Sequence, residues 1–461
     1  MIIPSLRLFC SVVIVLLLSH GRLPAQTAPA TPKGLGLRTG DRVIFIGDSI
    51  THQCQYTQYV ENFYFTRHPG QRIAFRNAGV SGDKAADVLA RFDDDIAAFK
   101  PTVATLLIGM NDGVYQDFNP ELMTAYTRDM TRLIEKLEAL KVRLFLMSPT
   151  MFDHQAFERM VAKDPARAKN KNPVNYNAVL AYMGCWLQEQ ARLRGHQFID
   201  LHGPLNRLTV QQRRSQPDFT LIADAIHPGG DGSFVMAYEM ISAFDEPGSV
   251  WSVGASVRNQ NWVVHTGPAN FLSKVEGKPG QLLSFRLRPA CLPWAVLEES
   301  RLGAALTFAG HRKGSEVLTI TGLEPGRYEV LENGQQLGVW DHIVLGRKIE
   351  LQSNAESPTL AQAQQVIMLN KQRNDEAIRP LRNLYGQRKG RLLGDRKAFE
   401  SWWNGEGRTK EAELLRKAAE IEEAIYKTNQ PLEVEFKIRP APKAAAKKPA
   451  AKAGPGTAVE N

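Results

Sequence analysis

The sequence predicts an α/β protein: a parallel sheet between two layers of helices, followed by a small β-rich region and a helical C-terminal region. Apolar runs alternate with amphipathic segments from about residue 36 to residue 245. Such repetition of strands and helices is typical of a parallel sheet that is covered on both faces. Beyond residue 250 the apolar runs shorten and turn residues become frequent, whereas the pattern after residue 356 is helical.

Five short segments of the first region are predicted to be buried strands, because β-branched and aromatic residues dominate them and turn-forming residues flank them. These segments are 42–46, 71–77, 102–108, 142–147 and 196–201. The clearest helix between them is 120–140, where apolar residues recur at helical spacing and Pro120 suits the first helical position. Two further helices are expected after Asn175 and after Gly232.

Residues 250–352 are predicted to form a small, antiparallel, β-rich accessory region. Two alternating segments in it are joined by Asn333-Gly334, the strongest sequence signal for a two-residue hairpin turn. Residues 353–440 are rich in Gln, Lys, Arg, Glu and Leu, which predicts a helical region, and they end in a strand-like segment at 432–438.

The first 25 residues have the layout of a secretory signal peptide. Arg7 precedes an apolar run of eleven residues at 8–18, whereas a helix that spans a bilayer needs about 20. The small residue Ala25 suits a cleavage site, and residues 26–35 are predicted to be a Pro-rich linker. The pattern predicts a secreted or periplasmic protein without a stable membrane span, and the alternative is an uncleaved N-terminal anchor.

The composition is that of a soluble globular protein, with 43% hydrophobic and 23% charged residues. Of the formal net charge of +9, Arg7 and Arg22 contribute two charges, and a tail at 441–461 contributes a net three. This tail is rich in Ala, Lys and Pro, so we expect it to be disordered. The rest of the chain is close to neutral, which gives no indication of a nucleic-acid partner.

The cysteine pattern does not indicate a dense disulfide framework. The sequence has four cysteines, and removal of Cys10 with the signal peptide leaves Cys54, Cys185 and Cys291. One disulfide with one free thiol and three buried free thiols are both compatible with this odd number. The spacing of Cys and His does not resemble a zinc site, and neither a metal nor a cofactor is expected.

A serine that could act as a nucleophile follows the first predicted strand, in the run Gly47-Asp48-Ser49. Ligands of open α/β sheets bind beyond the carboxyl ends of the strands, which is where this serine would lie. A serine hydroxyl needs a base within hydrogen-bonding reach and a third group that orients the base. Asp224 and His227 could provide both from one turn, with Asp224 bonded to Nδ1 and Nε2 facing Ser49.

A serine nucleophile of an acyl-transfer site also needs hydrogen-bond donors for the oxyanion that develops on the substrate. Gly79 follows the second predicted strand, and its missing side chain would allow a close approach of its backbone N–H. Asn111 follows the third strand and carries a side-chain amide. The backbone N–H of Ser49 would be the third donor.

In their order along the chain, these runs resemble the marks of the SGNH (GDSL) hydrolase family of esterases and lipases. The matching residues are Gly47-Asp48-Ser49, Gly79, Gly109-Met110-Asn111-Asp112 and Asp224-Ala225-Ile226-His227. The resemblance covers about residues 40–245 and implies a flavodoxin-like sheet, so we place the catalytic domain at 36–249. It says nothing about residues 250–461.

The resemblance implies a role for each site residue. Ser49 would be the nucleophile, His227 the general base and Asp224 the residue that orients it. Ser49, Gly79 and Asn111 would form the oxyanion hole. The implied activity is that of a carboxylic ester hydrolase that works without a metal or a cofactor.

The expected function is therefore that of a secreted serine hydrolase that acts through an acyl-enzyme. Its substrate would be a small-molecule or polysaccharide ester, such as an O-acetylated carbohydrate or a (lyso)phospholipid. One alternative is an acyltransferase, in which an alcohol replaces water at the same triad. The other is a non-catalytic glycan-binding protein on the same scaffold. The sequence makes no prediction of the oligomeric state.

Several further residues have both a structural and a functional interpretation. We expect packing in each case, although an acyl or sugar site is the alternative for the aromatic residues and lining of the pocket is the alternative for the histidine. They are Tyr56, Tyr59, Phe63, Tyr64, Trp402 and Trp403, together with His52.

Overall fold

The computed structural model describes residues 36–442 except 170, 172, 245, 268, 272–274 and 393–394. The predicted signal peptide at 1–25 and the predicted linker at 26–35 lie outside the described residues, as does the predicted tail from residue 443 on.

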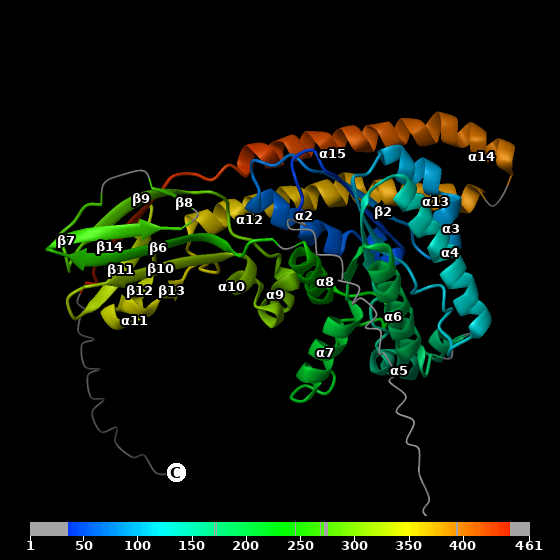
Figure 1. The fold of residues 1–461 in the computed structure, drawn as a ribbon, viewed down its shortest axis with the longest axis horizontal. Coiled ribbons are helices and arrows are strands. Elements are labelled where there is room, and N and C mark those ends of the chain that lie inside the picture. The colour runs from blue at the N-terminus through cyan, green and yellow to red at the C-terminus, as the bar shows by residue number, and fades with distance from the viewer. Residues whose placement is uncertain are drawn as a thin grey trace, which may run out of the picture. The chain divides into compact units, whose positions relative to one another are not determined.

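A five-stranded sheet forms the centre of the first half of the chain, in the order β2-β1-β3-β4-β5 (Figure 1). The strands are β1 (Arg42–Gly47), β2 (Ala74–Gly79), β3 (Val103–Leu107), β4 (Arg143–Met147) and β5 (Gln197–Ile199). All neighbouring strands pair in parallel, and the order is that of flavodoxin-like folds. The predicted α/β fold is therefore confirmed.

Helices cover both faces of this sheet. They include α2 (Gln55–Arg67), α3 (Ala85–Ala90), α4 (Pro120–Ala139), α5 (His154–Lys163), α6 (Tyr176–Arg194), α7 (His202–Arg213) and α8 (Gly230–Ala243). Helix α2 packs against α8, and α3 packs against α4. The predicted helix at 120–140 is α4, in which the Asn119 side chain accepts a hydrogen bond from the N–H of Leu122. The helix that was expected after Gly232 already begins at Gly230.

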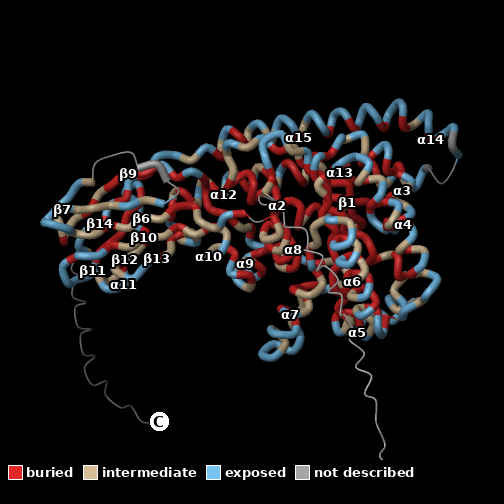
Figure 2. Tube along the Cα trace, viewed as in Figure 1, coloured by how far each residue is buried: buried red, intermediate tan, exposed pale blue. Residues whose placement is uncertain are grey.

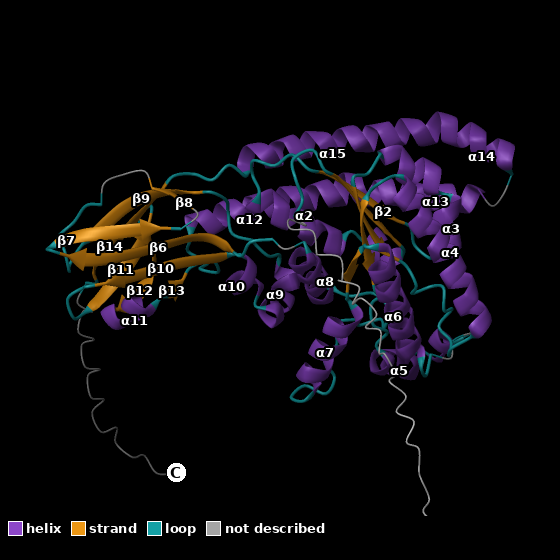
Figure 3. Ribbon diagram, viewed as in Figure 1, coloured by secondary structure: helices purple, strands orange, loops and turns teal. Residues whose placement is uncertain are grey.

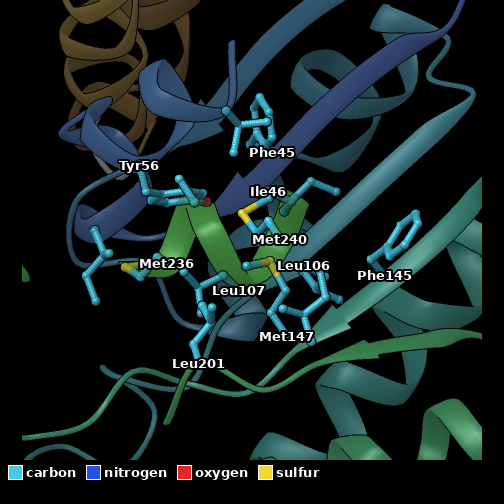
Figure 4. Packing of buried hydrophobic residues seen from close by; sticks show 14 of the residues in the cluster. Phe45, Ile46, Tyr56, Leu106, Leu107, Phe145, Met147, Leu201, Met236 and Met240 are labelled. Atoms are coloured by element: carbon cyan, nitrogen blue, oxygen red, sulfur yellow. The ribbon is translucent and has the colours of Figure 1, made fainter. Parts of the chain in front are cut away.

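The apolar core of the sheet continues into the C-terminal half of the chain. Figure 4 shows side chains from β1, β3, β4 and α8 in this core, among them Ile46, Leu106, Met147 and Met240. The same cluster includes residues of two C-terminal helices, and Figure 2 marks its buried residues in red. These residues are Ala363, Val366, Ile367, Ile425 and Tyr426. The C-terminal helices therefore help to cover the α/β domain.

Two further sheets follow the α/β domain (Figure 3), in the orders β13-β10-β6-β7 and β12-β11-β14-β9-β8. Their strands are β6 (Ser249–Arg258), β7 (Asn261–Thr266), β8 (Ala269–Phe271), β9 (Leu283–Pro289), β10 (Ser315–Thr321), β11 (Arg327–Glu332), β12 (Gln335–Asp341), β13 (Ile349–Glu350) and β14 (Val434–Pro440). The predicted turn at Asn333-Gly334 joins β11 to β12, and both of its residues have positive φ, 50° and 83°.

The prediction of an entirely antiparallel region is wrong at one pair of strands. Strand β10 pairs with β6 in parallel, which requires a long crossover rather than a tight turn. The segment between them includes α9 (Arg301–Thr307) and α10 (Ala309–Lys313). Helix α9 packs against α8, and the Asp231 carboxylate accepts a hydrogen bond from the N–H of Gly303 at 2.8 Å.

In the described part of the C-terminal region, four α-helices and two short π-helical turns precede the strand β14. The helices are α12 (Pro358–Arg373), α13 (Arg379–Leu392), α14 (Arg396–Trp402) and α15 (Arg408–Thr428). Helix α12 packs against both α2 and α15 (Figure 1), and α13 contacts β2. Strand β14 then pairs with β9 on one side and with β11 on the other. In the described part of the chain, none of the helices is long and apolar enough to cross a membrane.

Candidate active site

Ser49 is the first residue of α1 (Ser49–His52), which follows β1 after a single residue. That residue, Asp48, caps the helix, because its Oδ1 accepts a hydrogen bond from the N–H of Ile50 at 2.9 Å. Strand β1 lies between β2 and β3, where the direction of the strand order reverses. Ligands of such sheets bind at this switch point, beyond the carboxyl ends of the strands.

The structure brings the predicted Ser49, His227 and Asp224 together. His227 Nε2 lies 2.8 Å from Ser49 Oγ, and His227 Nδ1 lies 2.6 Å from Asp224 Oδ2. His227 and Asp224 occupy the turn that precedes α8, in which Ala225 has a left-handed backbone with φ of 71°. The His227 side chain is 26% exposed and the Asp224 side chain 47% exposed, so the cluster opens to solvent.

The hydrogen bonds of Asp224 determine which nitrogen of His227 carries a proton. Burial favours the neutral acid, but hydrogen bonds from the His227 ring and from the backbone N–H groups of Ile226 and His227 outweigh it and lower the pKa of Asp224. An ionised carboxylate can only accept, so Nδ1 is the protonated nitrogen. The lone pair of Nε2 then faces Ser49 Oγ, as a general base requires.

Asn111 lies close to the same site, in the loop after β3. One N–H of its amide donates to the backbone oxygen of Asp83 at 3.0 Å, and its Oδ1 accepts from the Tyr115 hydroxyl at 2.9 Å. The other N–H has only a long contact of 3.5 Å, to Asp48 Oδ2. This second N–H is therefore available to donate a hydrogen bond to a ligand. The role of Tyr115 was missed, because a tyrosine in a loop carries no motif.

The predicted oxyanion donor Gly79 does not have a free N–H. It is the last residue of β2, and its N–H donates to Asn77 Oδ1 at 2.9 Å. A Cβ on Gly79 would lie 2.3 Å from the backbone nitrogen of His52. A glycine is needed here because the end of β2 packs directly against α1. The hydrogen bond of its N–H to Asn77 argues against the predicted role as an oxyanion donor.

Gly82 differs from Gly79 in these respects. It lies in the loop after β2, is exposed, and has a left-handed backbone with φ of 75°. A Cβ on Gly82 would have no heavy atom within 4 Å, and among the described residues its N–H donates no backbone hydrogen bond. The next residue, Asp83, holds the Asn111 amide through its carbonyl oxygen. Gly82 and Asn111 therefore present their N–H groups from adjacent loops.

Two buried carboxyl groups lie beside the site. Burial raises the pKa of Asp48 to about 7, against the hydrogen bond from Ile50. Burial likewise raises the pKa of Asp112 to about 7, although its Oδ1 accepts from the N–H of Ala85 at 3.0 Å. Both side chains hold loops of the site through backbone N–H groups.

The residues with two interpretations are mainly packing residues. Tyr56, Tyr59, Phe63 and Tyr64 lie in α2 and are at most 2% exposed, and Trp403 packs edge-on against Tyr385 at 5.5 Å. His52 is partly exposed, and its Nε2 lies 2.8 Å from Asn383 Oδ1.

The cysteines of the described chain are all free. Cys54 and Cys291 are buried, but Cys185 is exposed, so neither alternative, one disulfide or three buried thiols, describes all three residues. The described residues contain no group of three or more His, Cys, Asp or Glu side chains that could hold a metal ion.

Comparisons with known proteins agree on the first half of the chain. Residues 45–233 match the family model of the GDSL-like lipase/acylhydrolases. An acetylxylan esterase from Geobacillus stearothermophilus is 23% identical over 221 residues, which are 43% of this chain and 91% of that protein. The solved structure of a gut microbial diltiazem-metabolizing enzyme is 24% identical with a TM-score of 0.76, and the match covers 88% of this chain and 100% of that one. This last likeness concerns the fold, including much of the C-terminal half.

Proposed function

We propose that Ser49 is the nucleophile of this protein. The premise is that residues 45–233 belong to the GDSL-like lipase/acylhydrolase family and that the chain is a carboxylic ester hydrolase. The observation that carries the proposal is the 2.8 Å distance between His227 Nε2 and Ser49 Oγ, with Asp224 at Nδ1. A serine next to a base that is itself oriented by a carboxylate is the arrangement that activates a hydroxyl.

In the proposed reaction, Ser49 Oγ attacks the ester carbonyl carbon while its proton moves to His227 Nε2. The tetrahedral intermediate collapses to the acyl-enzyme, and His227 gives the proton to the oxygen of the leaving alcohol. A water molecule then attacks the acyl-enzyme, again losing its proton to His227. Collapse of the second intermediate releases the acid and returns the proton to Ser49 Oγ. Asp224 remains ionised throughout and stabilises the protonated ring.

The oxyanion of both intermediates needs donors on the side of Ser49 away from His227. We assign the backbone N–H groups of Ser49 and Gly82 and the second amide N–H of Asn111. The N–H of Ser49 is available because the first N–H groups of a helix have no intrahelical acceptor. Gly82 replaces Gly79 in this role because the N–H of Gly79 is bonded to Asn77.

For the substrate, we propose acetyl esters of carbohydrates. The similarity to an acetylxylan esterase over the α/β domain supports this class. The partial exposure of His227 and Asp224 also supports it, because an acetyl group on a bulky sugar chain must reach the serine from outside. We also propose that the protein is exported, on the N-terminal sequence pattern alone.

The test is a hydrolysis panel of p-nitrophenyl acetate, a long-chain p-nitrophenyl ester, acetylated xylan and lysophospholipid, run with the wild type and with Ser49→Ala. We expect release of acetate from xylan by the wild type and loss of all ester cleavage in the variant. Undiminished cleavage by Ser49→Ala would overturn the assignment of the nucleophile. Preference for lysophospholipid would overturn the substrate class, and transfer of acetyl to an added sugar in place of hydrolysis would indicate the acyltransferase.

The export proposal has a separate test. Expression of the full chain in a bacterium with an outer membrane, followed by N-terminal sequencing, should give a periplasmic or secreted protein that begins at Gln26. A cytoplasmic product that keeps its first 25 residues would contradict the proposal.

A further inference from the structure

We propose that the C-terminal helix α13 positions the oxyanion donors of the esterase site. Residues 79–83, here called the oxyanion loop, contain Gly82 and connect β2 to the segment before α3. Helix α13 lies about three hundred residues further along the chain, yet its side chains contact Gly79, Val80 and Asp83 of this loop. The inference rests on the proposed function, because it concerns how well the oxyanion is bound.

Two cations of α13 hold the two ends of the oxyanion loop. The Nε of Arg382 donates to the backbone oxygen of Gly79 at 3.0 Å, and Lys389 Nζ lies 2.7 Å from Asp83 Oδ1. Arg382 is completely buried and also binds Asp95 at 2.7 Å, so its guanidinium is held in one place. Asp95 is itself held by Arg91 at 2.7 Å, so the counter-charge of Arg382 is also fixed.

The Asp83 contact leads directly to an oxyanion donor. One carboxylate oxygen of Asp83 binds Lys389, and the other binds Arg91 Nε at 2.7 Å. The backbone oxygen of the same residue accepts the hydrogen bond from Asn111 Nδ2. A shift of Asp83 would therefore move both Asn111 and the neighbouring Gly82.

An apolar contact holds the middle of the oxyanion loop. Val80 is 1% exposed, and every other buried member of its cluster lies in the C-terminal helices. These partners are Leu381, Leu384, Tyr385, Phe399, Trp403 and Leu414. Val80 thus anchors the loop to α13 and its neighbours, and not to the core of the α/β domain.

A third contact runs through His52. Its Nε2 lies 2.8 Å from Asn383 Oδ1, and its Nδ1 accepts the N–H of Ser81 at 3.2 Å. The acceptor role of Nδ1 makes Nε2 the donor to Asn383. Asn383 thereby sets the orientation of a ring that binds the residue directly before Gly82.

Gly82 is the one residue of the oxyanion loop for which the described structure shows no contact with another segment. A Cβ added to it would have no heavy atom within 4 Å. The N–H direction of Gly82 is then set by its two neighbours: Asp83, which Lys389 binds, and Ser81, which α13 reaches through Asn383 and His52. Donors that are fixed before the reaction stabilise an oxyanion most, because they do not have to reorganise. Arg382, Asn383 and Lys389 are in this sense positioning residues.

The test uses Lys389→Met, which removes the ammonium but keeps the length of the side chain, and Asn383→Ala, whose side chain is exposed. The control is Lys417→Met, because Lys417 forms an ion pair with Glu376 at 2.9 Å within the C-terminal helices, more exposed than that of Lys389 with Asp83. With p-nitrophenyl acetate we expect kcat of Lys389→Met to fall about 10- to 100-fold, with KM within about twofold of the wild type. Lys389→Arg should recover part of the loss, and the control should keep its kcat.

A trifluoromethyl ketone, which forms a tetrahedral adduct with a serine, provides a readout that a purely structural role would not move. Its affinity should fall in Lys389→Met by the same factor as kcat/KM, while the thermal midpoint stays near that of the wild type. Wild-type kcat in both Lys389→Met and Asn383→Ala would overturn the inference, as would an equal loss in Lys417→Met. Loss of activity in Ser49→Ala alone would then leave the proposed function intact and reject only the role of α13.

Discussion

His227 and Asp224 are joined by two hydrogen bonds, one from the ring and one from the backbone. The ring Nδ1 lies 2.6 Å from Asp224 Oδ2, and the backbone N–H of His227 donates to Asp224 Oδ1 at 2.7 Å. One carboxylate therefore fixes both the imidazole and the turn that carries it. Both hydrogen bonds are possible because the two residues are only three positions apart in the sequence.

Replacement of Asp224 by Asn should remove the negative charge beside His227 and keep the shape of the turn. The amide can still accept the backbone N–H, but it cannot carry the negative charge that stabilises a protonated His227. We expect kcat for p-nitrophenyl acetate to fall by roughly 10³- to 10⁴-fold, with little change in the thermal midpoint. An Asn variant with more than a tenth of the wild-type kcat would show that Asp224 does not orient the base.

The two glycines after the second strand should respond differently to alanine. In Gly82→Ala the new Cβ has room, but the left-handed backbone costs about 1 kcal/mol and its relaxation moves the donor, so kcat falls more than stability. In Gly79→Ala the Cβ meets the backbone of α1, so the thermal midpoint should fall steeply. Calorimetry and kcat measured on both variants check this pair. The reverse order of effects would restore Gly79 as the donor.

The buried carboxyl group of Asp48 should make the stability of the protein depend on pH. The pKa of its carboxyl is about 7 in the folded protein and near the ordinary value of 3.8 in the unfolded chain. The stability that it contributes is fully present below about pH 4 and is lost as the pH rises to about 7. Asp48→Asn, which does not titrate, should therefore gain stability over the wild type between these pH values, by about 1.4 kcal/mol for each unit of the pKa shift.

Urea unfolding of both proteins at about pH 4.5, 6 and 8 measures this gain. Asp48→Asn keeps an oxygen that can accept from Ile50, so the helix cap remains. A difference in the free energy of unfolding that stays constant over this range would contradict the burial argument.

The carboxyl group of Asp95 should make the stability of the protein depend on pH in the opposite direction. Burial favours its neutral form, but the guanidinium groups of Arg382 and Arg91, each at 2.7 Å, outweigh it and lower the pKa of Asp95 well below 3.8. The resulting stability is present above about pH 4 and is lost as the pH falls further. Asp95→Asn should lower the free energy of unfolding by about 3–5 kcal/mol at neutral pH, because buried guanidinium groups lose their counter-charge. Below pH 4 the two proteins should converge, and parallel acid-unfolding curves would refute this account.

The predicted site residues that the structure brings together are local in the sequence. The serine follows directly after a buried strand, and the base and its carboxylate lie within one turn, so neither required knowledge of distant contacts. The prediction for Gly79 depended on a second strand that ends at residue 77. Because β2 continues to Gly79, this glycine is part of the sheet, and the loop glycine is Gly82.

The contribution of the C-terminal helices could not be predicted in this way. A helical pattern shows that one face is buried, but not which part of the chain covers it. The contacts of Arg382 with Gly79 and of Lys389 with Asp83 join residues more than 300 positions apart. The parallel pair β6–β10 is likewise a choice between distant partners, which alternation along each strand does not decide.

The position of β14 has a consequence for how the chain is made. This strand leaves the ribosome after all the other strands, yet it lies between β9 and β11, which pair with it and not with each other. Until residues 434–440 have been synthesised, both neighbours present an open edge to any other unpaired strand. A chain that stops before Val434 would therefore carry all the residues of the ester-cleaving cluster and still be prone to aggregate.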